Sequence, residues 1–352
     1  MANPGGTTSA LADPRRWAVT LGGLAAYGFG SRLWLPGLDP DAATGLGIPA
    51  LSTDLSVFAV GVRPILFGLA FVEMGRVVLP PVARWAAGSR DHSERLWRMA
   101  RILALALAAA QAMGMGQAIE GLDGVAPSPG PMFRLGVVAA IVVATAFLIW
   151  LARIMTERGV GDGLLVLFAA PLVAHLPYDA AASAEAVRTG LAPAWAPPAP
   201  ASLIIAAIAL LVVSARTPGG GRSLDIWPPL LGTIVLQALS AFTLLADAAS
   251  GGMLSPLFDA IPPLIRLLLL IAAQGGLIWL FAVWRGRTRG ADARPLGAEI
   301  LVCSGALFLS LAYGVGGPMS GPWIILCVAA GLGVASGKAQ MDGGLSGPTP
   351  TA

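Results

Sequence analysis

Repeated apolar segments, separated by short stretches that contain Gly, Pro and Arg, constrain this chain more than any other feature of its sequence. A helix needs about 20 apolar residues to cross the ~30 Å hydrocarbon core of a bilayer. Charged residues make up only 12% of the chain, whereas a soluble domain carries roughly 25%. The sequence therefore predicts an all-α membrane protein with about ten transmembrane helices, at residues 17–29, 55–79, 99–119, 135–154, 164–176, 202–214, 230–246, 264–284, 300–315 and 323–336.

The distribution of Arg and Lys predicts the orientation, because loops on the cytoplasmic side of a membrane carry an excess of these residues. With the N-terminus in the cytoplasm, the inner side collects Arg15, Arg16, Arg84, Arg90, Arg95, Arg98, Arg101, Arg153, Arg158, Arg216, Arg222, Arg285, Arg287, Arg289, Arg294 and Lys338. The outer side keeps Arg32, Arg134, Arg188 and Arg266, beside several acidic residues. We expect an even number of spans and both termini in the cytoplasm.

The regions outside the spans differ in composition. Residues 1–16 and 341–352 are predicted to be disordered tails, and residues 1–13 lack the basic and apolar regions of a cleaved signal peptide. The Ala- and Pro-rich outer loop at 177–200 is predicted to be irregular. The basic isoelectric point follows from the inner loops, and no basic run carries the interleaved aromatic residues of a nucleic-acid surface.

One motif suggests an enzyme. Gly159-Val160-Gly161-Asp162 has the GxGD pattern of intramembrane aspartyl proteases, whose chemistry needs a second carboxylate at close range on a neighbouring helix. The only Tyr-Asp pair, Tyr178-Asp179, falls in a loop on the opposite side. We interpret Asp162 as a first-turn residue favoured by the helix dipole, not as a catalytic group.

Other reactive residues also lack the partners that chemistry requires. His92 and His175 have no His or Cys at ligand spacing, and Cys303 and Cys327 lie in apolar runs without a CxxC pattern. No phosphate-binding loop or nucleophile elbow is present. We predict no enzymatic activity, no metal and no cofactor.

The second span contains two charges, Arg63 and Glu73, although charge within a membrane is costly and usually faces a bundle interior or water. Val62, Leu66 and Glu73 are spaced by four and seven residues, which places them on one helix face. Glu73 either lines a pathway or lies at the interface paired with Arg76. Both interpretations remain open at this stage.

The segment Trp150-Leu-Ala-Arg-Ile-Met-Thr-Glu-Arg-Gly-Val-Gly-Asp-Gly-Leu164 closely resembles the signature of the SecY family of protein-conducting channels at the junction of its fourth and fifth helices. The signature positions are Thr156, Glu157, Arg158, Gly159, Gly161 and Gly163. Ser56-Val-Phe-Ala-Val-Gly-Val62-Arg-Pro64 is similar to the family's second helix, and Leu35-Pro36-Gly37-Leu38-Asp39 to the stretch before its plug. The resemblance covers residues 17–200, and the later helices follow by order and topology.

The resemblance implies two inverted five-helix halves, at residues 17–200 and 201–340, with a lateral gate between the second and seventh helices. It also implies a ring of apolar side chains at the waist, formed by Val62, Leu66, Leu164, Phe168, Gln237 and Leu326. A narrow apolar constriction can block ions without binding them; ordinary helix packing is the alternative role for each of these residues. The implied partners are SecE-like and SecG-like small membrane subunits and a nascent or secretory polypeptide.

The sequence also departs from the family. The plug is reduced to roughly residues 42–53, and Arg63 replaces an apolar residue beside the ring. The loops at 216–225 and 285–295 are short, which leaves little chain for docking SecA or a ribosome. We therefore predict a specialised channel of the bacterial inner membrane. The alternative is a small-solute transporter of another family, which would need buried charge on several helices, whereas the sequence indicates it in the second span alone.

Overall fold

A computed structural model of the protein describes residues 13–45, 55–122, 124–190, 198–215, 224–249, 260–289, 296–313 and 321–336. These residues form twelve α-helices and, apart from an isolated antiparallel bridge between Trp34 and Ser56, no β-structure. Ten helices coincide with the predicted spans: α2 (Pro14–Gly30), α5 (Arg63–Val78), α7 (Arg90–Glu120), α8 (Pro131–Arg158), α9 (Gly163–Arg188), α10 (Pro198–Ala215), α11 (Trp227–Ala249), α13 (Pro263–Arg289), α14 (Leu296–Tyr313) and α15 (Gly321–Ser336). Two short helices, α3 (Pro40–Gly45) and α6 (Pro80–Ala87), lie between them.

The helices differ in whether they are long and apolar enough to span a membrane. Among the described residues, three stretches are long and apolar enough to span a bilayer, at Asp91–Glu120, Pro131–Arg158 and Pro263–Arg287. Helices α5 and α6 would supply a fourth as one broken span, since they meet at a bend of 107°. Five other apolar helical stretches are shorter than 18 residues, at Gly163–Ala174, Ile205–Ser214, Trp227–Leu239, Gly297–Leu307 and Trp323–Ala335.

The prediction that the second span is helical from residue 55 is wrong. Helix α5 begins only at Arg63, and the residues before it pair with the chain after α2. The Leu35 N–H donates to the Leu55 carbonyl (3.0 Å) and the Val57 N–H to the Leu33 carbonyl (2.8 Å). These bonds satisfy backbone groups that a helix would otherwise satisfy internally. Val62 therefore precedes the helix instead of lying within it.

The prediction of an irregular loop at 177–200 is also wrong over its first part. Helix α9 continues to Arg188, because the run 179–187 is rich in Ala, the strongest helix former. Arg188 donates from Nε to Glu185 (2.7 Å) and lowers the pKa of that carboxyl. Residues 191–197 lie outside the described residues, as do 46–54, so only α3 represents the predicted plug.

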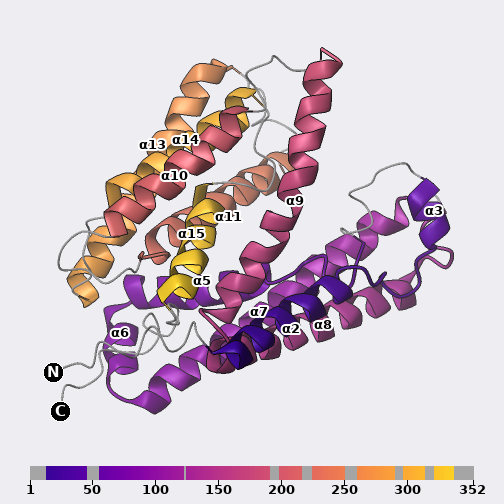
Figure 1. The fold of residues 1–352 in the computed structure, drawn as a ribbon, viewed down its shortest axis with the longest axis horizontal. Coiled ribbons are helices and arrows are strands. Elements are labelled where there is room, and N and C mark those ends of the chain that lie inside the picture. The colour runs from indigo at the N-terminus through magenta and orange to yellow at the C-terminus, as the bar shows by residue number, and fades with distance from the viewer. Residues whose placement is uncertain are drawn as a thin grey trace. The chain divides into compact units, whose positions relative to one another are not determined.

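The chain divides into two compact units. Unit 1 consists of residues 1–73, 84–170 and 333–352, and contains α2, α7 and α8, which lie side by side in Figure 1. Small residues let α7 approach its neighbours closely: Ala104, Ala108 and Ala112 are fully buried at four-residue spacing. Part of this core joins α7 and α8 to the segments around Leu35 and Leu55.

Unit 2 consists of residues 74–83 and 171–332. In it α13 packs against both α11 and α14, and α14 also contacts α10 (Figure 1). Its core is built from branched apolar side chains of α10, α13, α14 and α15, with the buried Cys303 among them. The halves at 17–200 and 201–340 stay a prediction.

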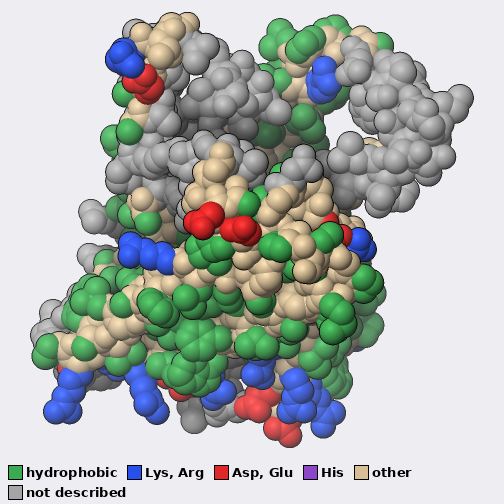
Figure 2. All heavy atoms as spheres, turned by 90° about the vertical axis from the view of Figure 1, so that its right-hand side faces the viewer, with side chains coloured by type: hydrophobic (Ala, Val, Ile, Leu, Met, Phe, Trp, Pro, Cys, Tyr) green, Lys and Arg blue, Asp and Glu red, His purple; other side chains and the backbone are tan. Residues whose placement is uncertain are grey.

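Many large apolar side chains are exposed on the helices of unit 1, including Val143, which is 69% exposed, together with Leu135 and Ile102. Figure 2 shows a broad hydrophobic region on the drawn face, with Lys, Arg, Asp and Glu gathered along its lower edge. Exposed apolar surface of this extent indicates contact with lipid or with another protein. The surface thus agrees with the predicted membrane location.

Candidate functional site

The junction between α8 and α9 reverses the chain within four residues, 159–162. The Thr156 hydroxyl lies at its centre: it donates to the Ala152 carbonyl and accepts from the Gly163 N–H, both at 2.9 Å. One side chain therefore joins the last turn of α8 to the first residue of α9. The Gly159 N–H closes the end of α8 on the Met155 carbonyl (2.8 Å).

Gly159, Gly161 and Gly163 all lack room for a side chain. A Cβ on Gly163 would overlap the Ala152 carbonyl oxygen, which is a backbone atom and cannot turn away. Gly161 has a φ of +79°, in the left-handed region that favours Gly. A Cβ there would also lie 2.9 Å from Cγ2 of Val334, in the last turn of α15, a turn that belongs to unit 1.

Thr20 of α2 holds the junction from outside. Its hydroxyl accepts a hydrogen bond from the Val160 N–H (2.9 Å) and donates to the Arg16 carbonyl (3.3 Å). Both Thr20 and Val160 are buried, so this bond satisfies an N–H that water does not reach and that would otherwise be left without an acceptor. Sequence reasoning missed Thr20, because a lone Thr in an apolar helix carries no signal of a partner 140 residues away.

Asp162 caps α9, as the sequence predicts. Its Oδ1 accepts from the Leu164 N–H (3.1 Å) and the Leu165 N–H (3.4 Å), which is the usual task of an Asp at a helix start. The two charged signature residues behave differently. Glu157 accepts from Arg153 Nε (2.6 Å) on the exposed face of α8, and Arg158 is exposed at the end of that helix.

The predicted ring residues of unit 1 are all buried. Val62 directly precedes α5 and Leu66 lies in its first turn, whereas Leu164 and Phe168 occupy the first turns of α9 directly after the junction. Leu164 lines the same cavity as Ile65 of α5, so these two helices approach one another within unit 1. In unit 2, Leu326 of α15 is buried and Gln237 of α11 is exposed. The convergence of all six on one ring stays a prediction.

The two charges of the second span are in different surroundings. Arg63 is the first residue of α5 and is exposed, whereas Glu73 is 0% exposed and Arg76, one turn later, is also buried. A buried carboxylate needs a partner or another source of stabilisation. Glu73, the last residue of the first segment of unit 1, therefore lies in the protein interior.

Phe58 lies in residues 56–64, the second segment that carries the family resemblance, and its contacts hold this segment in place. Its ring stacks between Tyr27 and Phe147, with centroids 5.6 and 6.1 Å away, and it occupies the space that a side chain at Gly30 would need. Aromatic contacts of this kind fix the position of a non-helical segment between two helices. The segment before α5 is thus positioned by α2 and α8.

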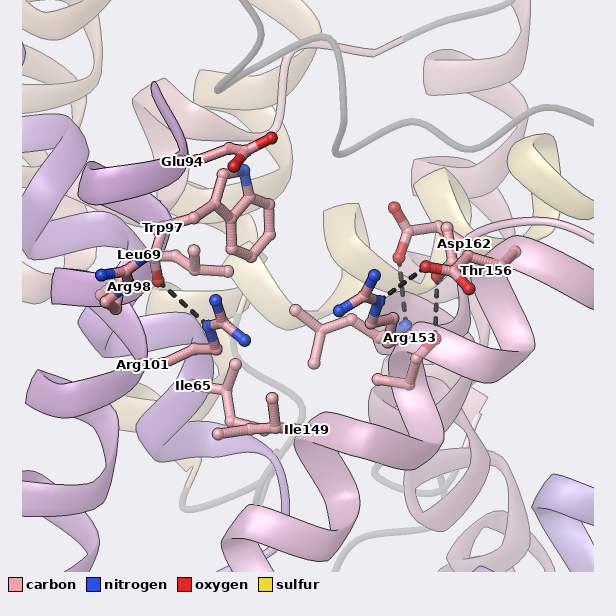
Figure 3. Close-up of a pocket in the computed structure, with 14 residues that line it drawn as sticks. Ile65, Leu69, Glu94, Trp97, Arg98, Arg101, Ile149, Arg153, Thr156 and Asp162 are labelled. Carbon is pink, nitrogen blue, oxygen red and sulfur yellow. Dashed lines mark hydrogen bonds and ion pairs between the residues drawn. The ribbon is translucent and has the colours of Figure 1, made fainter. Parts of the chain in front are cut away.

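A cavity of about 380 Å³ opens within unit 1 between α7 and α8. Figure 3 shows Arg101 of α7 and Arg153 of α8 pointing into it from opposite walls, with Trp97 and Glu94 beside Arg101. Ile65 and Leu69 of α5 and Ile149 of α8 form its apolar part. Sequence reasoning assigned these arginines to orientation only and did not predict a cavity.

Unit 2 contains a charged cluster that the sequence did not reveal. Arg285 Nε donates to Asp225 Oδ2 (2.8 Å), and the other Asp225 oxygen accepts from the Trp227 N–H at the start of α11 (3.2 Å). Glu299 of α14 is buried and close enough to both for their charges to act on it. The expectation that buried charge occurs in the second span alone is therefore wrong, because α13 continues beyond the predicted span to Arg289.

Metal-ligating groups do not gather among the described residues: no three His, Cys, Asp or Glu side chains lie close enough to hold an ion. The His92 ring stacks on Trp85, and its Nδ1 lies 2.7 Å from the Trp85 carbonyl oxygen. The side chain of His175 lies outside the described residues.

The chain is similar to known proteins in sequence and in fold. A family model described as SecY matches residues 56–218. The protein translocase subunit SecY of Buchnera aphidicola subsp. Acyrthosiphon kondoi is 28% identical over 193 residues, which cover 50% of this chain and 54% of that protein. The SecY of Escherichia coli K12 is also 28% identical over 193 residues, covering 50% and 44%. The chain thus spans about half the length of the curated relatives it matches.

The structural likeness extends further along the chain. Sec61 from the canine ribosome–channel complex of the endoplasmic reticulum superposes with a TM-score of 0.61 at 12% identity, covering 92% of this chain and 91% of that one. This likeness confirms the predicted fold class, an all-α membrane protein of about ten helices. Together with the sequence matches, it also confirms the predicted resemblance.

Proposed function

We propose that this chain, which is a divergent member of the SecY family, forms a channel through which polypeptides cross or enter the bacterial inner membrane. The observation that carries the proposal is the α8–α9 junction. It ends in Gly163 and thereby places Leu164, and Phe168 one turn later, at a fixed position in unit 1.

The apolar residues around the start of α5 and in the first turns of α9 are the proposed constriction. Val62, Leu66, Leu164 and Phe168 are large or branched, uncharged and buried. A collar of such side chains excludes water and ions while it offers a passing polypeptide no strong binding site. Gln237 and Leu326 would complete the collar from unit 2.

The position of the collar depends on a rigid support. The Thr156, Gly161 and Gly163 contacts leave the junction little freedom, and Thr20 holds it to α2. We propose that the signature has this supporting role and no catalytic one.

The remaining expectations belong to the same proposal. Both termini lie in the cytoplasm, and SecE-like and SecG-like subunits accompany the chain. The loop residues 216–223 and 290–295, which would dock SecA or a ribosome, lie outside the described residues, and their short length favours another motor or the insertion of short segments. A specialised paralogue fits these features better than a housekeeping translocon.

In-cell photo-crosslinking tests the channel. A photoreactive amino acid is placed at Leu66 or Phe168, and a stalled secretory nascent chain is supplied. We expect crosslinks from both positions to the nascent chain. The matched control is Val143 of α8, which is apolar but exposed toward the surroundings, and which should crosslink to lipid or not at all.

Failure at Leu66 and Phe168, alongside a SecY that crosslinks in the same cells, would reject the channel. If Val143 crosslinks to the nascent chain as efficiently as Leu66 and Phe168 do, the nascent chain touches the protein but does not follow a path lined by Leu66 and Phe168. A normal affinity of SecA for membranes that contain this chain would overturn the expectation of another motor.

A small-solute transporter is the second candidate, and the observation that favours it is the cluster of the buried Arg285 and Glu299 with the partly buried Asp225. Buried charge on several helices is typical of ion and solute pathways. Solute uptake that is abolished by Arg63→Ala or Glu299→Gln, with protein export intact, would support this function over the channel.

A further inference from the structure

The charged cluster of unit 2 contains two carboxyl groups and one guanidinium. Arg285 lies in the last turns of α13, Glu299 in the first turn of α14, and Asp225 two residues before the start of α11. Arg285 Nε donates to Asp225 Oδ2 at 2.8 Å, and the charges of both residues are close enough to act on Glu299. With all three side chains ionised, this largely buried cluster would therefore hold one negative charge in excess.

The two carboxyl groups differ in their hydrogen bonds. Asp225 accepts from Arg285 through one oxygen and from the Trp227 N–H through the other (3.2 Å), so its ionised form is well satisfied. Glu299 is 1% exposed, and its Oε1 has no hydrogen-bond partner among the described residues. A buried carboxylate without such partners is costly, and the group becomes neutral instead. The excess negative charge is therefore most readily removed by a proton on Glu299.

The helices around Glu299 contribute no second positive charge to the cluster within the described part of the chain. Helix α14 packs against α10, α11 and α13, and the next arginine of α13, Arg287, is exposed. Helices α10 and α15 contain no charged residue, and the one acidic residue of α11, Asp247, is at the opposite end of that helix. Cys303, one turn after Glu299, is a buried thiol without charge. Among these groups only Arg285 can offset a charge on Glu299.

The cluster joins three helix ends on one side of unit 2, the side that the predicted orientation places in the cytoplasm. The Asp225–Arg285 bond connects the start of α11 to the end of α13 across 60 residues of sequence. An ionised Glu299 would compete with Asp225 for the same guanidinium and would repel the Asp225 carboxylate. The charge on Glu299 therefore affects how firmly the start of α11 is held.

We propose that Glu299 is a proton-binding switch. In the resting state its carboxyl group holds a proton, and Arg285 balances Asp225 alone. At alkaline pH on the cytoplasmic side the proton leaves, the Asp225–Arg285 bond weakens, and the start of α11 is loosened. The switch requires unit 2 but not a channel. In the channel of the proposed function, α11 is the seventh span and borders the predicted lateral gate, so loss of the proton would loosen that side of the gate.

The melting temperature of the purified full-length chain in detergent tests the proton, at about pH 5 and about pH 8.5. A proton that the folded chain holds and the unfolded chain releases makes the folded chain less stable as the pH rises. Glu299→Gln resembles the protonated carboxyl group and has no such proton to lose. We therefore expect the melting temperature of the variant, relative to the parent, to be higher at the alkaline pH than at the acidic pH, by at least about 2 °C.

The matched control is Glu185→Gln, which removes an exposed carboxylate of unit 2 that is paired with Arg188. Glu185 is ionised at both pH values, because Arg188 lowers the pKa of its carboxyl group. The difference between this variant and the parent should therefore be nearly the same at the two pH values.

Hydrogen exchange tests whether the proton controls the start of α11. The backbone amides of residues 226–236 are compared between the parent and Glu299→Gln at the same pH, so that the intrinsic exchange rates cancel. At about pH 8.5 we expect these amides to exchange about tenfold faster in the parent, and at about pH 5 equally fast in both. Amides of residues 141–151 in α8, which belong to unit 1, should not differ at either pH.

Several results would overturn the proposal. If Glu299→Gln changes the melting temperature equally at both pH values, Glu299 is ionised throughout and has a basic partner in residues 216–223 or 290–295. A Glu299→Gln chain that does not fold would exclude a neutral side chain in the resting state. A pH-dependent melting temperature without a change in exchange at residues 226–236 would leave a buried acid that controls nothing. An equal pH-dependent shift in Glu185→Gln would indicate a general effect of charge. Each of these results is independent of crosslinking from Leu66 and Phe168, which tests the channel.

Discussion

Unit 1 and unit 2 are both bundles of apolar helices, but they pack by different means. In unit 1 backbone lies against backbone: Gly163 is pressed on the Ala152 carbonyl, and a Cβ on Gly68 would lie 2.5 Å from the Ala100 carbonyl oxygen. In unit 2 the glycines are less confined. Gly276 has nothing within 4 Å of an added Cβ, and Gly232 meets the Ile278 side chain at 3.2 Å.

This difference explains which part of the sequence is recognisable. A backbone contact or a left-handed φ admits one residue type, so the motif must be kept wherever the geometry is kept. A core of branched side chains tolerates exchange among apolar residues of similar volume. The family model accordingly matches residues 56–218, most of which belong to unit 1, whereas the fold likeness covers 92% of the chain.

The largest effect should come from Gly163→Ala. The new methyl group would overlap the Ala152 carbonyl oxygen and crowd Met155, and neither backbone can yield without opening the junction. We expect a loss of about 3 kcal/mol in the free energy of unfolding, at the upper end for overpacking. The measurement is the apparent melting temperature of the purified chain in detergent.

Gly276→Ala in unit 2 is the matched control, because it adds the same methyl group to a helix with free space. It should leave the melting temperature at, or slightly above, that of the parent, because Ala favours a helix over Gly. If both variants lose the same stability, the two units do not differ in the way their backbones pack.

Most of the helices could be predicted from the sequence, because long apolar runs have few alternatives in a membrane. The exceptions are instructive. Residues 55–62 are apolar enough for a helix, but their hydrogen bonds go to the chain near Leu33 and Leu35. The run 179–187 has a loop-like flank, yet its alanines continue α9. In each case a contact or a propensity beyond hydropathy decides the outcome.

The candidate site divides in the same way. The signature glycines and Thr156 could be recognised because each is required by local geometry. Thr20 and the Asp225–Arg285 pair could not, since their partners are 140 and 60 residues away. The spacing of residues in a sequence does not indicate which residues so far apart are in contact. A single Thr or Arg at the end of an apolar run also occurs in many other roles.

A threonine in each unit sharpens the comparison further. Thr20→Val removes the acceptor of the buried Val160 N–H and should cost about 1–3 kcal/mol of unfolding free energy, the penalty for an unsatisfied buried donor. Thr233→Val, at an equally buried site in α11, removes a hydroxyl that only donates to the Pro229 carbonyl of its own helix. That carbonyl keeps its place in the helix, so we expect a small effect.

Melting temperatures of the two valine variants, measured in one detergent, test this difference. Crosslinking from Phe168 should also weaken in Thr20→Val, because the junction that positions the start of α9 is loosened. Equal losses in the two variants would mean that the long-range bond of Thr20 contributes no more than a hydrogen bond within a helix.

The smallest expected effect is at glycines that touch nothing. Gly136 of α8 and Gly331 of α15 lie in different units, and neither would bring an added Cβ within 4 Å of another residue. Ala at each should stabilise by about 0.5 kcal/mol, because Gly loses more backbone freedom than Ala in a helix. The two melting temperatures should rise by similar amounts, since helix propensity acts alike in both units. If the melting temperature rises for Gly331→Ala but falls for Gly136→Ala, close packing in unit 1 extends beyond the junction. The two units would then differ in packing density as a whole, and not only at a few positions that require Gly.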